Sequence, residues 1–384
     1  MSRRLLILFA LVTAVLLAAT GCGKQSGQST TTKSQGDTLK IALVGPLTGG
    51  DAEFGRDAAN GAQLAVDEAN SQGGVLGKKI EIEIMDDKAD PKEAVNAANK
   101  IVSDSAISAV VGHINSGTTI PASGVYNRGG IAMVTPSSTN PRITQQGFNN
   151  VFRICITDAM QGPFCAKLAM QKLGKKSFAV LHDKTAYGEG IASSFRDSAE
   201  KLGGKVLIFE GITKGDTDFS ALLTKIRDLN PDAIFYGGMS PEGGLIAKQS
   251  NQLGLKATLM APDGCLAPQF IKIGGAGAEG AIVTFLAPPW DKEPTAATFV
   301  KKYSEKYGDI KNYAPFGYDA TWTVIKAIEK AKKADRNAVI DALRSSDFSH
   351  KGITGAIRFD KNGDVIGHDP YVYIVKNGKF EVFK

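Results

Sequence analysis

Small hydroxyl side chains follow a β-branched run in the first half of the chain. Val110 and Val111 end at Gly112, and Ser116 comes just after them, where a stretch that can be helical begins. This order predicts a buried parallel strand, a tight turn and a helix N-terminus. The Ser116 hydroxyl could cap that helix, and the free amides of the first turn could bind an anion such as a carboxylate. Taken alone, an ordinary helix cap without a ligand is the commoner explanation.

Other polar side chains also follow predicted strands. In the first half these are Ser137, Ser138 and Thr139, and in the second half Asp183 with Tyr187, Met239 and Asp263. Ligands of doubly wound sheets bind at the carboxyl ends of the strands. Hydroxyls and helix amides suit a carboxylate, whereas an acidic oxygen suits an ammonium. The two halves together therefore suggest a site for a zwitterion, although each acid alone is more often a cap or a turn residue.

Strands that alternate with helices position these residues. The predicted strands cover residues 39–44, 80–84, 109–111 and 131–134, and the rhythm restarts after residues 151–154 with strands at 178–181, 206–209, 233–236, 258–260 and 281–286. Helices are expected between them, one from Pro91 to about Ser103 and another beginning near Gly162-Pro163. Helices near 298–307, 318–332 and 336–345 follow, and a closing hairpin pairs 371–375 with 379–383. This rhythm predicts an α/β protein with two similar units, each a doubly wound parallel sheet.

The N-terminus has the features of an export signal. Arg3 and Arg4 precede an apolar run from Leu5 to Ala19, and Thr20-Gly21-Cys22 follows. We expect residues 1–21 to be a lipoprotein signal peptide and residues 22–37 to be a flexible tether. Lipidation of Cys22 would anchor the protein to a membrane in the periplasm or cell envelope without a spanning helix. A plain signal peptide with an incidental cysteine is the alternative.

The composition limits the function classes. The content of 43% hydrophobic and 22% charged residues is typical of a globular protein. The formal charge is +6, but the sequence has no block of basic residues that would indicate nucleic-acid binding. Cys155, Cys165 and Cys265 lack metal-site spacing, and an export compartment would permit a disulfide among them. No cofactor or metal is indicated.

The segment Gly275–Gly280 matches a dinucleotide fingerprint but precedes a predicted strand, so a Rossmann-like oxidoreductase is the least favoured interpretation. His113 and His182 are interpreted as packed or hydrogen-bonded residues.

Six motifs in order resemble the substrate-binding proteins of branched-chain amino acid ABC transporters, the leucine/isoleucine/valine-binding family. They are Ile41–Gly49, Gly112-His113, Thr135-Pro136, His182-Asp183-Lys184 with Tyr187–Gly190, Asp218-Phe219-Ser220 and Phe235–Gly238. The resemblance covers Thr38 to the C-terminus. It implies a two-lobed periplasmic-binding-protein fold of type I with three crossover strands at the hinge. Lobe 1 would comprise 38–156 plus 287–371, and lobe 2 would comprise 157–286 plus 372–384.

The resemblance also assigns roles to residues. Ser116 and Thr139 would hold the α-carboxylate, which Tyr187 would reach from the other lobe. Asp263 would meet the α-ammonium with help from Thr139 and the Ser137 carbonyl. The side-chain pocket would be shaped by Phe54, Ile114, Met239 and Phe316.

The sequence departs from the best-known members of the family at three places. Asp263 stands where they have Glu, Met239 replaces an aromatic residue, and Ala89 and Asn115 replace two disulfide-forming cysteines. The first two changes affect the preferred substrate, and the third removes a covalent link without touching the proposed chemistry.

The leading hypothesis is a non-catalytic, monomeric solute-binding lipoprotein. It would capture a branched-chain or other aliphatic amino acid and deliver it to the membrane permease of an ABC importer. A receptor of the same fold for amides, urea or aromatic acids is the alternative, and an acid at Asp263 favours an amino acid.

Overall fold

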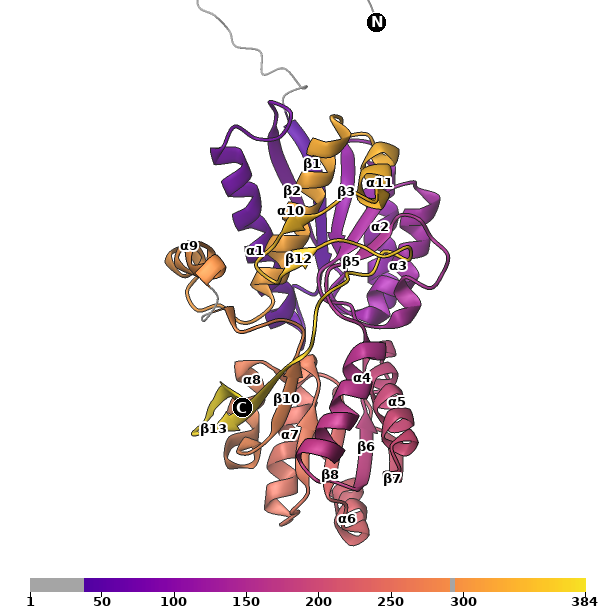
Figure 1. The fold of residues 1–384 in the computed structure, drawn as a ribbon, viewed down its shortest axis with the longest axis vertical. Coiled ribbons are helices and arrows are strands. Elements are labelled where there is room, and N and C mark those ends of the chain that lie inside the picture. The colour runs from indigo at the N-terminus through magenta and orange to yellow at the C-terminus, as the bar shows by residue number, and fades with distance from the viewer. Residues whose placement is uncertain (1–37, 291–293) are drawn as a thin grey trace, which may run out of the picture. The chain divides into compact units, whose positions relative to one another are not determined.

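The computed structural model describes residues 38–290 and 294–384. Two main sheets and a short two-stranded one organise this part of the chain (Figure 1). The strands of the first sheet are β1 (Thr38–Gly45), β2 (Lys79–Asp86), β3 (Ile107–Gly112), β4 (Ala132–Thr135) and β5 (Val151–Arg153). The strands of the second are β6 (Ser177–His182), β7 (Lys205–Gly211), β8 (Ala233–Gly237), β9 (Thr258–Ala261), β10 (Ile282–Phe285), β13 (Tyr371–Lys376) and β14 (Lys379–Val382). The short sheet pairs β11 (His350–Lys351) with β12 (Ala356–Ile357).

The first sheet is parallel throughout, in the order β2-β1-β3-β4-β5. The second has the order β14-β13-β10-β9-β8-β6-β7, and its strands are parallel from β7 to β10. The antiparallel hairpin of β13 and β14 pairs with β10 and was predicted from the sequence. The two-lobed doubly wound fold is therefore confirmed, whereas the lobe boundaries stay a prediction.

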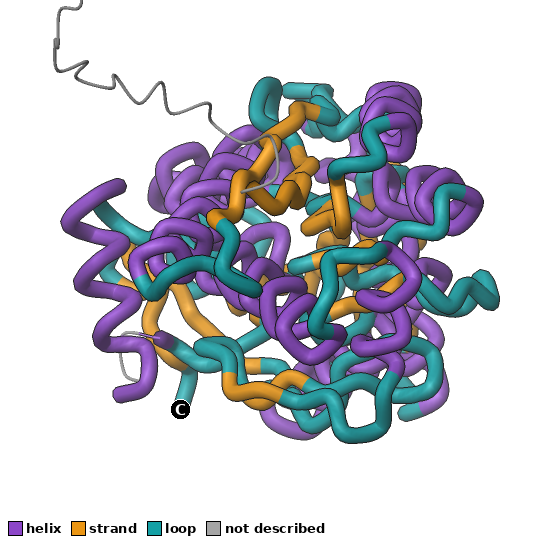
Figure 2. Tube along the Cα trace, turned by 90° about the horizontal axis from the view of Figure 1, so that it is seen from above, coloured by secondary structure: helices purple, strands orange, loops and turns teal. Residues whose placement is uncertain are grey.

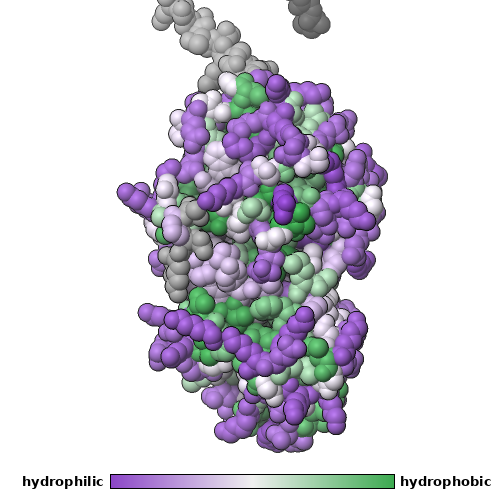
Figure 3. All heavy atoms as spheres, viewed as in Figure 1, coloured by the Kyte–Doolittle hydropathy of each residue, from purple (hydrophilic) through white to green (hydrophobic). Residues whose placement is uncertain are grey.

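The helices fill the spaces between strands in sequence. Their bounds are α1 (Ala52–Ser71), α2 (Pro91–Ser103), α3 (Ser116–Arg128), α4 (Asp158–Lys167), α5 (Ala186–Lys201), α6 (Ser220–Leu229), α7 (Ser240–Gln252), α8 (Pro268–Gly274), α9 (Ala297–Tyr307), α10 (Ala314–Ala331) and α11 (Arg336–Arg344). Viewed from above, helices flank the strands, some of which reach the edge of the molecule (Figure 2). On the face in Figure 3, hydrophilic side chains predominate, and apolar ones gather near α8 and β13.

The first strand shows how the sequence builds two cores. Ile41 and Leu43 pack into the larger core, which includes residues of α1 and α10, whereas Ala42 and Val44 pack into a second core with residues of α2 and α3. Alternate side chains of a strand point to opposite faces, so this run of apolar residues serves both layers. Helices α1 and α10 pack against each other, as do α2 and α3.

Helix α2 begins where the sequence predicted, because Pro91 needs no partner for an N–H and the Asp90 side chain accepts from the amides of Lys92 and Glu93. The expected start of α4 near Gly162 is wrong. That helix begins at Asp158, whose amide donates to the carbonyl of Thr139, and Pro163 lies inside it. The acidic first turn favours this earlier start, since a carboxylate interacts well with a helix N-terminus.

Three segments connect the two lobes, at residues 154–157, 286–290 and 366–370 (Figure 1). Arg153 stands at the first of them and is buried although it is charged. Its guanidinium pairs with Asp364 beside the third segment, and its Nη1 also donates to the carbonyls of Ser138 and Asn140. One buried arginine therefore fixes two of the connections and the loop that follows β4.

Candidate functional site

The β3–α3 turn supplies the helix end of the candidate site. Asn115 occupies the N-cap position in an extended conformation, and Ser116 is the first helical residue. The expected capping role of the Ser116 hydroxyl is therefore wrong. This hydroxyl instead accepts from the amide of Asn140 at 3.2 Å. The amides of Ser116 and Gly117 have no acceptor within the helix, since the first amides of any helix lack one, so an anion could bind there.

The loop after β4 lies against this turn. The Ser137 hydroxyl donates to the carbonyl of Ile114 at 3.2 Å, and the Ser138 hydroxyl bonds to Thr119 Oγ1 at 2.6 Å. Both serines are buried. The hydroxyls thus hold the loop after β4 against the β3–α3 turn. The polar groups at the carboxyl ends of β3 and β4 therefore lie next to each other.

Asp263 lies two residues beyond the end of β9, at the start of a 3₁₀ turn, and is the acidic group on the opposite side. Its Oδ1 accepts from the Tyr187 hydroxyl at 3.0 Å, and its Oδ2 accepts from the Tyr313 hydroxyl at 3.1 Å. The Tyr187 oxygen also accepts from the amide of Gly264 at 2.9 Å. A Cβ on Gly264 would stand 2.6 Å from the carbonyl oxygen of Gly238, so this close packing requires glycine.

Burial raises the pKa of Asp263 to about 6, and the hydrogen bonds from Tyr187 and Tyr313 only partly oppose this effect. The carboxyl is therefore easily protonated, and an arriving ammonium group would stabilise its ionised form.

These residues enclose one cavity between the two lobes. It is lined by Phe54, Ile114, Asn115, Ser116, Ser137, Tyr187, Met239, Asp263 and Tyr313. Seven of the nine ligand-binding residues expected from the sequence thus lie around a single space. Its volume is only about 20 Å³, which is roughly the room that one water molecule needs.

Two of the expected residues do not line the cavity. Phe316 is fully buried behind it, with its ring centroid 6.3 Å from that of Tyr313 and 5.9 Å from that of Phe285. Thr139 is fully buried and lies beside the Asp158 carboxyl. Burial raises the pKa of Asp158 to about 7, and the contact with Thr139 opposes that shift in part.

Tyr313 and Asn115 also line the cavity. No pattern in the sequence singled out Tyr313, and Asn115 was noted only as the replacement of a cysteine. Tyr313 precedes α10, in the part of the chain that returns from the second lobe, and its ring meets that of Phe54 edge-on at 5.1 Å. Asn115 stands next to Ser116, so its position at a strand end was the one available signal.

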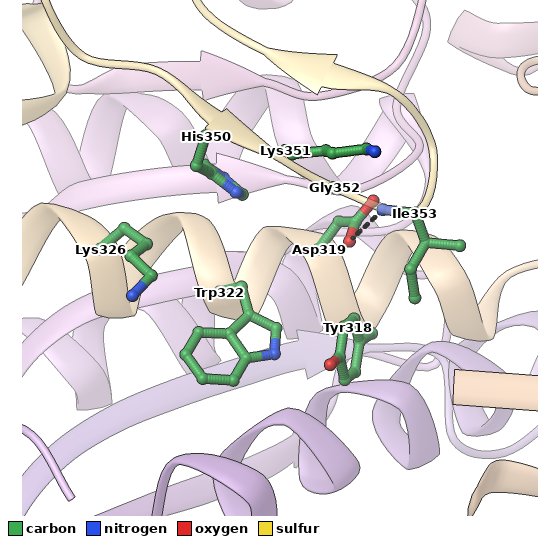
Figure 4. Close-up of a pocket in the computed structure, with 8 residues that line it drawn as sticks. All are labelled: Tyr318, Asp319, Trp322, Lys326, His350, Lys351, Gly352 and Ile353. Atoms are coloured by element: carbon green, nitrogen blue, oxygen red, sulfur yellow. Dashed lines mark hydrogen bonds between the residues drawn. The ribbon is translucent and has the colours of Figure 1, made fainter. Parts of the chain in front are cut away.

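A larger cavity of about 520 Å³ lies on the first lobe, away from these residues (Figure 4). Tyr318, Trp322 and Lys326 extend into it from α10, opposite His350 and Lys351. Its buried acid, Asp319, already accepts from the amides of Ile353 and Thr354, and Tyr318 donates to Glu68. Because these polar groups are already bonded, the smaller cavity between the lobes is the better candidate for a zwitterion.

The remaining motifs have structural roles. Gly275–Ala278 forms a turn of 3₁₀ helix between α8 and β10, and not the strand–helix turn of a dinucleotide site. His113 is fully buried and bonded to Asp87 at 2.7 Å and to Tyr126 at 3.0 Å, which confirms the packed interpretation. Within the described chain, Cys155, Cys165 and Cys265 are buried free thiols.

The predictions for the N-terminus concern residues that the structure does not describe. Cys22, the signal peptide and the tether fall outside the described residues. Among the helices that the structure describes, none has the length and apolar character needed to cross a membrane.

Comparison with known proteins gives a consistent set of relatives. The family described as "Periplasmic binding protein" matches residues 38–379. A "Leucine-, isoleucine-, valine-, threonine-, and alanine-binding protein" of Pseudomonas aeruginosa is 40% identical over 338 residues, covering 88% of this chain and 90% of the relative.

Two solved structures extend the likeness to the fold. A leucine-binding protein, LivK, of Thermotoga maritima is 35% identical with a TM-score of 0.84, covering 90% of this chain and 98% of that protein. LivJ of Streptococcus pneumoniae, a branched-chain amino acid transporter substrate-binding protein in complex with isoleucine, is 31% identical with a TM-score of 0.83 and the same coverage.

Proposed function

Because this chain belongs to the periplasmic binding proteins, among relatives named for leucine, isoleucine and valine, we propose that it captures a branched-chain aliphatic amino acid between its lobes and delivers it to an ABC importer. The role is one of binding, without catalysis. The protein acts as a monomer in the periplasm or cell envelope.

One observation carries the proposal. Helix amides and hydroxyls at Ser116 and Ser137 line the same cavity as the Asp263 carboxyl. An α-carboxylate would be held by the helix end, with Thr139 and Tyr187 supporting it as the family resemblance implies. The α-ammonium would pair with Asp263, assisted by the Ser137 carbonyl, and such charge-assisted bonds are the strong ones.

The remaining walls favour an aliphatic side chain. Phe54, Ile114 and Met239 present apolar surface to the cavity, and Phe316 supports it from behind. An acid at the site disfavours aromatic acids, because a ligand without an ammonium would leave the ionised Asp263 unpaired. Uncharged amides and urea would also leave that charge without its counter-ion.

The small cavity supports a hinged mechanism. Leucine does not fit in about 20 Å³, so the lobes must part to admit it and then close on it. The closed form would be the one that the membrane permease recognises. Lipidation of Cys22 would keep the protein near that permease.

Calorimetric titration with the twenty amino acids, benzoate and urea tests the proposal. We expect saturable binding of leucine, isoleucine or valine, and none of benzoate or urea. Small-angle scattering should then show a smaller radius of gyration with the bound amino acid. Binding of benzoate or urea in place of every amino acid would refute the assignment.

A further inference from the structure

An ion pair connects the two lobes beside the cavity. Nζ of Lys214 lies 2.6 Å from Oδ2 of Asp51. Asp51 immediately precedes α1 on the first lobe, and Lys214 follows β7 on the second. The Asp51 side chain is 0% exposed and that of Lys214 is 32% exposed. Within residues 38–290 and 294–384, this is the one ion pair that joins an element of the first lobe to an element of the second.

Two further carboxyl groups surround Lys214 on its own lobe. Asp183 and Glu242 each keep one buried carboxylate oxygen without a hydrogen-bond partner in the described chain. Burial alone would lower the pKa of Lys214, but the carboxylates of Asp51, Asp183 and Glu242 outweigh burial and raise it. The Lys214 ammonium therefore stays protonated, and it keeps Asp183 and Glu242 as neighbours when the lobes part. Asp51, by contrast, loses Lys214 as its ion-pair partner.

Asn115 links this ion pair to the cavity wall. Its Nδ2 donates to the same Asp51 Oδ2 at 2.9 Å, and the residue lines the cavity. Lys214 is not a lining residue. A change at Lys214 therefore removes no direct contact with the cavity and acts on a ligand through Asp51 and Asn115, through the positions of the lobes or through the loss of its charge.

We propose that the Asp51–Lys214 ion pair is a latch that forms when the cleft closes and that sets how long the amino acid is held. Closing brings the two charges together, and opening separates them. Any interaction present only in the closed form raises the apparent affinity for a ligand that binds that form. Lys214 is thus a positioning residue, and this inference rests on the proposed function.

The first test compares ligand dissociation in K214M and the unmodified protein. Methionine keeps the length of the side chain and removes its charge. We expect leucine to bind about tenfold more weakly to K214M, within the usual range for coupling between sites. Most of the loss should lie in a faster dissociation rate, as is usual among variants of one site.

K302M is the matched control. Lys302 Nζ is also 2.6 Å from a carboxylate oxygen, that of Glu68, but this pair joins α9 to α1 and does not cross between the lobes. The affinity of K302M for leucine should equal that of the unmodified protein. All variants should melt without ligand within a few degrees of the parent, which shows that the fold is intact.

A double-mutant cycle separates a latch from a general charge effect. D51N should weaken binding about as much as K214M, and the double variant should be no weaker than either, because one interaction is lost in each case. Additive losses, or affinities of K214M and K302M that agree within twofold, would overturn the latch.

Scattering of ligand-free protein at low salt gives an answer independent of the ligand. We expect a larger mean radius of gyration for K214M than for the parent and K302M, since the latch favours closure. If the unmodified protein does not bind leucine, the proposed function fails. The radii of gyration of the ligand-free proteins then determine alone whether the ion pair favours the closed form. Equal radii in that case would overturn it.

Discussion

The hydroxyl of Tyr313 donates to a carboxylate oxygen of Asp263 at 3.1 Å, although Tyr313 precedes a helix of the first lobe and Asp263 follows a strand of the second. Tyr187 holds the other oxygen from the second lobe. The acidic group of the site is therefore oriented by one phenol from each lobe. An arriving ammonium meets a carboxylate that is already positioned, which lowers the ordering cost of binding.

Replacing Asp263 should separate affinity from stability. A charge-assisted hydrogen bond contributes roughly 1.5–3 kcal/mol, so D263A and D263N should bind leucine at least about tenfold more weakly. Calorimetric titration measures this loss. Unchanged affinity in a folded D263A protein would remove the ammonium role from Asp263.

The same D263N variant should be more stable without ligand. Because the pKa of Asp263 is raised to about 6, ionising it costs the folded state free energy above that pH, and the cost disappears as the pH falls towards 3.8. We expect D263N to gain about 1–3 kcal/mol of unfolding free energy at pH 7.5 and less at pH 5. A melting curve at each pH checks this, and a less stable D263N at pH 7.5 would contradict it.

Leucine affinity should depend on pH through the same group. Pairing with an ammonium needs the ionised carboxylate, so affinity should be full above the pKa of about 6 and fall by up to about tenfold per pH unit below it. Titrations from pH 5 to pH 8 measure this dependence. Calorimetry at pH 6 in two buffers of different ionisation enthalpy should detect proton release on binding, and its absence would argue against Asp263 as the partner.

Removing the Tyr313 hydroxyl should shift that dependence. Y313F takes away one bond that opposes the effect of burial, so the pKa of Asp263 should rise and the midpoint of the pH profile should move upward. Affinity at pH 7.5 should fall by roughly threefold to tenfold. Y303F is a suitable control, because Tyr303 donates to Asp57, outside the cavity. An unshifted midpoint in Y313F would show that Tyr313 does not influence Asp263.

The Cys22 prediction can be tested in cells. We expect C22S to leave the membrane fraction and to be found in the soluble fraction of the exported protein. A control substitution at the neighbouring Gly23 should leave the protein in the membrane fraction. If the unmodified protein is already entirely in the soluble fraction, the lipid anchor is wrong.

The sequence predicted those parts of the site that depend on local order along the chain. Ser116, Ser137 and Asp263 stand two to four residues after the ends of strands, and parallel strands bring their carboxyl ends to one edge of each sheet. Local pattern was enough for these residues because strand, turn and side chain are consecutive. The same reasoning located α2 from Pro91.

The remaining features depend on contacts between distant segments. Tyr313 reaches Asp263 only because the chain crosses back to the first lobe, which no local pattern around residue 313 records. Asn115 took the N-cap position expected for Ser116 because its backbone remains extended, a choice that the sequence of small polar residues left open. Phe316 lies behind the cavity because the ring of Tyr313 occupies the place in front of it.

The late strands β13 and β14 have a consequence for the way in which the polypeptide is made. Strand β10 pairs with β9 on one side and with β13 on the other, yet 85 residues separate the end of β10 at Phe285 from the start of β13 at Tyr371. During synthesis, the backbone amides and carbonyls on the β13 side of β10 therefore lack this strand partner until the ribosome has synthesised α9, α10 and α11. An open strand edge is a template for pairing with another chain. A nascent chain arrested before Tyr371 should thus be prone to self-association, and a binding partner that shields β10 until the hairpin emerges would suppress it.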